Sequence, residues 1–160
     1  MTSHSDDIAP PYETEMEFSV DSFELLTNRH LNALTGQVVS RPVLFLNVSL
    51  VSSYSWPGGD PLPPPVPEIG EAQVIFTDLL HPNVGDIDGD YIQLYVSIVE
   101  TQTWWQILSN GPSTLWVGVS EELGVVDVYL EPRHPGGHDK ASERRTAVRT
   151  RLRRLAEASG

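Results

Sequence analysis

The sequence predicts a mainly β protein, either an antiparallel β-sandwich or a partly open barrel of six to seven strands, with one C-terminal α-helix. Three observations support this fold class. Apolar and polar residues alternate with a period of two in several stretches of residues 15–132, as in half-buried strands. Clusters of Gly, Pro, Asn and Asp, which favour turns, separate these stretches. After residue 139 the apolar period becomes that of a helix.

The N-terminal residues 1–14 are rich in Ser, Asp and Pro, and we expect them to form a disordered acidic arm. An antiparallel β domain is expected to follow over residues 15–132. Strand alternation begins at Glu15. The apolar phase then shifts by one residue, which predicts a β-bulge near Asp21 or Ser22.

The next strand is predicted within residues 38–56, after a connection at residues 27–36. Its main part is expected after Pro42, because proline is confined to strand starts, edges and bulges. The proline-rich residues 57–67 predict an extended loop. This loop would serve either as a rigid spacer between strands or as a Pro-x-x-Pro ligand for another protein.

Two further β stretches are predicted at residues 71–80 and 91–108. The second contains no Gly or Pro, but its core-facing parity changes between Glu100 and Thr103. This change predicts either a bulge or bend, or two strands divided by a tight turn.

The last strands are predicted around residues 115–119 and 126–130. A turn at residues 121–124 joins them, and Gly124 supplies a positive φ there if the turn requires one. Together with residues 91–108 they predict an antiparallel meander.

A linker is predicted at residues 133–139 and a basic amphipathic helix at residues 140–160, with Asp139 as its N-cap. On a helical wheel this segment shows a narrow apolar stripe with arginines on both sides. We expect the helix to dock on an apolar groove bordered by acidic residues, either of its own domain or of another copy. The alternative is an ordinary terminal helix whose arginines are solvated. The residues expected to make this contact are Arg144, Arg145, Val148, Arg149, Arg151, Leu152, Arg153 and Leu155.

The formal net charge of −12 divides into two opposite parts. Residues 140–160 carry seven basic and two acidic residues, a net +5, whereas residues 1–139 carry three basic and 20 acidic residues, a net −17. An acidic body repels nucleic acid and attracts basic proteins. The charge pattern therefore predicts a protein partner, including a second copy of this chain, and disfavours nucleic acid.

Aromatic residues in the predicted strands lie mainly opposite the best aliphatic faces. If those outer faces align, they form an amphipathic aromatic surface of the kind enriched in binding hot spots. The alternative is that the helix or the proline-rich loop covers this second face. The aromatic residues expected to bind a partner are Tyr91, Tyr95, Trp104, Trp105, Trp116 and Tyr129.

The turn containing Asp86, Asp88 and Asp90 concentrates carboxylates, which Ca²⁺ prefers as ligands, but its spacing does not match an EF-hand loop. An ordinary Asp- and Gly-rich turn is the alternative. The chain has no cysteine and none of the common catalytic or cofactor-binding motifs. We therefore assign no catalytic residue, no cofactor and no metal.

These observations favour a non-enzymatic protein-binding or assembly module, such as an adaptor, an inhibitor or a structural subunit. A β-barrel carrier of a small apolar ligand is the alternative, and an enzyme of unidentified type is a further one. No run of about 18 apolar residues occurs, so no membrane-spanning segment is expected. The absence of cysteine and of an apolar signal-peptide core favours the cytoplasm.

Overall fold

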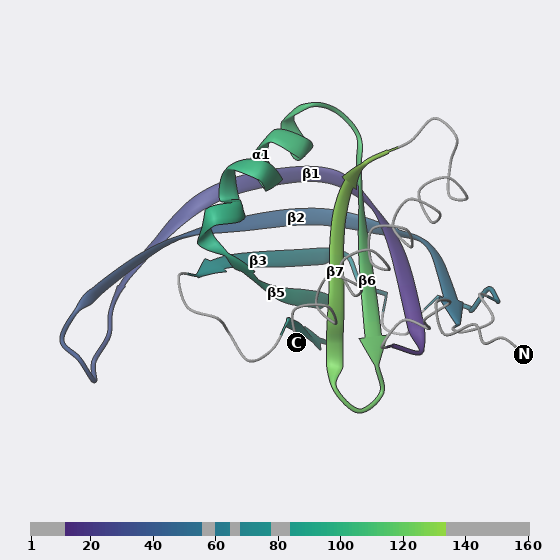
Figure 1. The fold of residues 1–160 in the computed structure, drawn as a ribbon, viewed down its shortest axis with the longest axis horizontal. Coiled ribbons are helices and arrows are strands. Elements are labelled where there is room, and N and C mark those ends of the chain that lie inside the picture. Colours follow the sequence, from purple (N-terminus) through teal and green to yellow (C-terminus); the bar gives the residue numbers. More distant parts are fainter. Residues whose placement is uncertain (1–11, 56–59, 65–67, 78–83, 134–160) are drawn as a thin grey trace, which may run out of the picture. The chain divides into compact units, whose positions relative to one another are not determined.

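Seven strands form a mixed sheet that closes into a barrel in the order β1-β2-β3-β5-β4-β7-β6 (Figure 1). The mainly β fold predicted from the alternation is therefore confirmed. The strands are β1 Thr14–Leu31, β2 Val38–Ser55, β3 Glu71–Thr77, β4 Gly85–Asp88, β5 Tyr91–Ser97, β6 Ser113–Ser120 and β7 Gly124–Pro132.

The computed structural model describes residues 12–55, 60–64, 68–77 and 84–133. Pro11–Pro132 form one compact unit. Most of the expected N-terminal arm and linker, part of the proline-rich loop, and the whole expected helix at residues 140–160 lie outside the described residues. The expected arm extends to residue 14, whereas Tyr12 is buried and β1 begins at Thr14.

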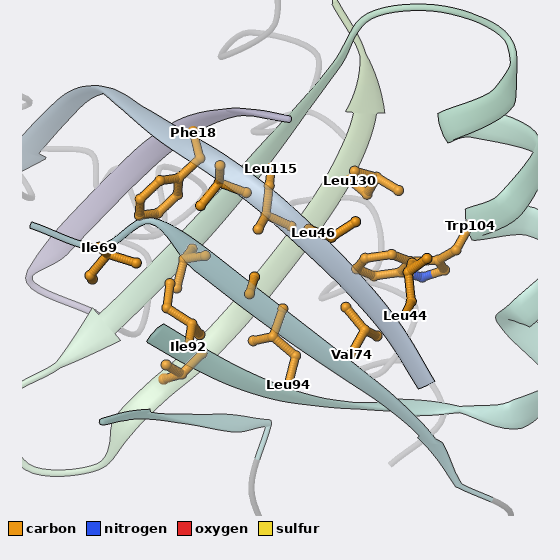
Figure 2. Close-up of a cluster of buried hydrophobic side chains, with 14 of the residues drawn as sticks. Phe18, Leu44, Leu46, Ile69, Val74, Ile92, Leu94, Trp104, Leu115 and Leu130 are labelled. Carbon is orange, nitrogen blue, oxygen red and sulfur yellow. The ribbon is translucent and has the colours of Figure 1, made fainter. Parts of the chain in front are cut away.

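Apolar side chains from the inner faces of the strands fill the barrel (Figure 2). Successive residues of a strand point to opposite faces, so each strand contributes every second residue to this core. The fully buried members include Phe18, Leu46, Val74, Phe76, Ile92, Leu94, Leu115 and Val117.

The predicted bulge in β1 is present. The register between β1 and β2 shifts between Val20 and Ser22, which leaves Asp21 as the extra residue. The Asp21 carboxylate accepts hydrogen bonds from the hydroxyls of Ser19 and Ser49. The bulge therefore changes the inward-facing parity of β1, as the phase shift in the sequence indicated.

The expected connection at residues 27–36 is wrong, because β1 continues to Leu31 and pairs with β2 along its whole length. The turn is confined to Asn32–Gln37, where the Asn32 side chain accepts a hydrogen bond from the Leu34 amide at 2.9 Å. The β1–β2 hairpin is therefore much longer than the core requires, and Figure 1 shows it extending past the ends of β3 and β5.

The expected β stretch at residues 91–108 is only partly correct. β5 ends at Ser97, and a 3₁₀ turn (η1, Ile98–Glu100) leads into the helix α1, Thr101–Ser109. Trp104 and Leu108 are one helical turn apart and are both buried, and the Trp104 ring contacts Phe76 edge-on at a centroid distance of 6.3 Å. The change of parity near Glu100 thus marked a change to helical periodicity, and packing against the core overrides the modest helix propensity of Thr and Trp.

One strand pairing also differs from the all-antiparallel expectation. β3 and β5 are parallel, with β4 on the other side of β5. β6 and β7 form the expected hairpin, and Gly124 has a φ of 78°. However, α1 carries the chain away from β5 before β6 begins, so the expected three-stranded meander reduces to this one hairpin.

The barrel closes between β4 and β7 through a single residue pair, Gly85 with Val125. A Cβ atom at position 85 would lie 2.4 Å from the Gln93 carbonyl oxygen and 2.9 Å from a Leu94 methyl carbon. Real Cβ atoms do not approach backbone so closely, so glycine is required for β4 to pack against β5 at this point.

Gly85→Ala is expected to reduce the free energy of unfolding by about 1–3 kcal/mol, the usual cost of overpacking a tight site. Urea denaturation followed by tryptophan fluorescence measures this loss. Gly70→Ala is the matched control, because no atom lies within 4 Å of a Cβ built there. Equal effects of the two substitutions would contradict the assignment of Gly85 to a tight contact.

Candidate functional site

Carboxylates gather on the outer wall of the barrel where β1, β6 and β7 lie side by side. Register places Glu15 beside Gly118 and Asp127 in one row, and Glu17 beside Trp116 and Tyr129 in the next. These residues alternate with core residues and therefore point outward. We call the following set the acidic face: Tyr12, Glu15, Glu17, Trp116, Asp127, Tyr129 and Glu131.

Hydrogen bonds hold three of these carboxylates. The Tyr12 hydroxyl donates to Glu15 Oε2 at 2.7 Å, and Trp116 Nε1 donates to Glu131 Oε1 at 2.9 Å. The Ser52 hydroxyl of β2 donates to Glu17 Oε1 at 2.6 Å. Hydrogen bonds to an ionised acceptor are stronger than neutral ones, so they fix the direction in which each carboxylate points.

Residues of the acidic face are far less exposed than is usual on an outer wall. Trp116 is 1 % exposed and Glu15 is 2 % exposed, and Tyr12 and Glu131 are also buried. Burial of a carboxylate is strongly unfavourable unless hydrogen bonds and positive charge compensate for lost hydration. The arrangement therefore suits contact with a group that is both cationic and partly apolar.

Gly118 makes room for the Tyr12 ring. A Cβ atom at position 118 would lie 2.5 Å from Tyr12 Cδ2, so the ring rests directly on the β6 backbone. Sequence patterns do not predict this contact, because Tyr12 lies in the polar N-terminal stretch. Glu15, Glu17, Asp127 and Glu131 are also absent from the predicted site residues, since only the strand register shows that they share a face.

The six aromatic residues expected to bind a partner do not form one surface. Trp116 and Tyr129 are neighbours on the acidic face, whereas Tyr91 and Tyr95 lie on the outer side of β5. Trp104 belongs to the core. Trp105 is 40 % exposed and contacts Phe23 edge-on at a centroid distance of 5.3 Å. The expected helix residues between Arg144 and Leu155 lie outside the described residues.

Asp86 and Asp88 lie on β4, and Asp90 lies in the turn before β5. Among the residues that the structure describes, no three His, Cys, Asp or Glu side chains form a group able to hold a metal ion. Instead, the Tyr91 hydroxyl donates a hydrogen bond to Asp88 Oδ2 at 3.2 Å. The pKa of Tyr91 is raised above its ordinary value. The largest cause is the negative charge of Asp88, and the second is this hydrogen bond.

Comparison with protein-family models, with curated proteins and with solved structures finds no match to this chain. Within the described part of the chain, no helix is both long and apolar enough to cross a membrane.

Trp116→Phe is expected to lower the free energy of unfolding by about 1–3 kcal/mol, because it leaves the buried Glu131 carboxylate without its indole donor. Thermal or urea denaturation measures the loss. Trp105→Phe removes the same atoms from a partly exposed ring and is expected to change stability by about 0.5 kcal/mol or less. A smaller loss for Trp116→Phe than for this control would contradict the role of the indole hydrogen bond.

Asp88→Asn is expected to lower the pKa of Tyr91 toward its ordinary value of 10.0, because it removes the charge that opposes phenolate formation. The ¹³Cζ chemical shift of Tyr91, recorded by NMR as pH is raised, follows this titration separately from the other four tyrosines. Asp60→Asn is the control, since Asp60 is not among the groups that shift Tyr91. An unchanged Tyr91 titration in Asp88→Asn would show that Asp88 does not act on the phenol.

Proposed function

We propose that this chain is a non-enzymatic protein-binding or assembly module, and that its acidic face binds a basic, partly apolar segment of protein. The observation that carries the proposal is the gathering of four carboxylates around the buried Trp116 ring. Aromatic rings and hydrogen-bonded charges at the centre of a patch are the features of binding hot spots.

Charge complementarity supports a basic occupant. Residues 1–139 contain only Arg29, Arg41 and Arg133 as basic residues, whereas seven of the ten Lys and Arg residues lie in 140–154. The predicted amphipathic helix at residues 140–160 therefore has the chemistry that the acidic face requires. The occupant is this segment of the same chain, the same segment of a second copy, or a similar segment of another protein.

The filled interior of the barrel argues against the alternative of a small-molecule carrier. Every strand except β4 contributes side chains to one buried cluster inside the barrel. A carrier of the lipocalin kind instead keeps its interior partly open for a ligand. The alternative of an enzyme gains no specific support from the described residues.

The proposal is tested with a synthetic peptide of residues 140–160, labelled with a fluorophore and titrated with the full chain and with a chain ending at Asp139. We expect anisotropy to rise with the shorter chain, and the affinity to fall as salt is added, because screening weakens contacts between charges. Binding by the shorter chain alone indicates that the segment normally occupies its own chain. Binding by both indicates contact between copies, and binding by neither contradicts the proposal.

Matched variants of the shorter chain distinguish the acidic face from general acidity. Glu17→Gln with Asp127→Asn is expected to weaken peptide binding about tenfold or more, equivalent to about 1.4 kcal/mol. Asp60→Asn with Glu68→Gln makes the same change of net charge at exposed positions off the acidic face and is expected to leave affinity unchanged. Equal loss in both double variants would contradict the assignment of the acidic face.

A further inference from the structure

The β1–β2 hairpin continues well beyond the barrel wall. β1 pairs with β6 only from Thr14 to Ser19, and β2 pairs with β3 only from Val43 to Asn47. Among the described strands, residues 25–31 of β1 pair only with β2, and residues 38–41 of β2 pair only with β1, so both outer edges of this ribbon are open. We call residues 25–41 the arm; this hairpin segment is distinct from the acidic arm expected at residues 1–14.

The arm exposes large apolar side chains to water. Leu34 at its tip is 97 % exposed, Leu31 is 64 % exposed, and Leu25, Leu26 and Val38 are also exposed. A two-stranded ribbon is only marginally stable in water, and open strand edges readily pair with other chains. Concentrated apolar exposure on such a ribbon is typical of an interaction element rather than of a solvated hairpin.

The charge of the arm is opposite to that of the barrel. Residues 25–41 include Arg29 and Arg41 and contain no Asp or Glu, although residues 1–139 carry 20 acidic residues. Arg29 shares one face of the ribbon with Leu31 and Val38, because residues two apart in a strand point the same way and Val38 pairs with Leu31. The arm therefore presents positive and apolar groups together.

A complementary surface lies at β4 of the same chain. β4 pairs with β7 only at Gly85, so the edge of β4 beyond this residue is open among the described strands. Asp86 and Asp88 are exposed there, and Ile87 is 39 % exposed although it belongs to the inner parity of the strand. β4 thus offers an open edge, two carboxylates and an apolar side chain.

We infer that the arm of one copy binds the open β4 edge of a second copy, which makes the chain a self-assembling subunit. This inference deepens the proposed function by naming a second copy as a partner. The two surfaces differ, so the contact is heterologous and builds a ring or a filament according to whether its rotation closes. Edge pairing supplies backbone hydrogen bonds, and the arginines and aspartates fix the choice of edge.

The test is a charge exchange in the full chain, followed by sedimentation velocity over a range of concentrations. The native chain is expected to form assemblies that weaken as salt is added. Arg29→Glu with Arg41→Glu, and separately Asp86→Arg with Asp88→Arg, are each expected to raise the dissociation constant about tenfold or more, since like charges then meet. An equimolar mixture of the two variants restores opposite charges at each contact, and we expect it to assemble.

A second pair of variants tests the apolar part of the arm without changing charge. Leu31→Ser with Leu34→Ser is expected to abolish assembly and to leave thermal stability unchanged, because both side chains are exposed. Val51→Ser with Leu123→Ser changes two exposed apolar residues outside the arm and is expected to have no effect on assembly.

A native chain that stays monomeric at all concentrations would overturn the inference, as would assembly that survives both arm variants or a mixture that fails to assemble. These outcomes are independent of the peptide titration. Peptide binding with a monomeric chain refutes the arm contact alone. Arm-dependent assembly without peptide binding refutes only the role of the acidic face.

Discussion

Six residues of β1, Thr14–Ser19, pair with β6 and thereby join the first and last strands of the closed ring. Because closure fixes which side of each strand faces inward, it commits Phe18 and Leu115 to the core and sends Glu17 and Trp116 to the outer wall. The same strand then passes through the bulge at Asp21 and extends as one side of the arm. Core, acidic face and arm are therefore consequences of how one long strand is paired along its length.

Charge follows from the same division between inside and outside. A barrel whose interior is filled with apolar side chains leaves its carboxylates no place but the outer wall, where they repel one another and favour any cationic neighbour. The basic residues are instead confined to two places, the arm and residues 140–154, apart from Arg133. A chain built in this way carries both halves of an electrostatic contact, which is why the two proposals concern different surfaces but the same physical attraction.

The candidate site was only partly predictable. Sequence parity placed Trp116 and Tyr129 opposite the aliphatic residues of their strands, and the structure makes them neighbours on one face. It could not show that Glu15 and Asp127, more than 100 positions apart in the sequence, lie in one row, because that depends on strand order and register. It also grouped Trp104 with the surface aromatics, although this residue lies on α1 and its ring is in the core.

The sequence by itself determined the β class, the bulge at Asp21 and the β6–β7 hairpin with Gly124, because these depend on local alternation and on the φ angles that a turn allows. Tertiary structure alone decided the parallel pairing of β3 with β5, the helix α1, the length of the arm and the closure at Gly85. Each of these depends on contacts between residues distant in sequence. At Thr101–Ser109 the local preference is weak, so burial of Trp104 and Leu108 against the core selects a helix where alternation had indicated a strand.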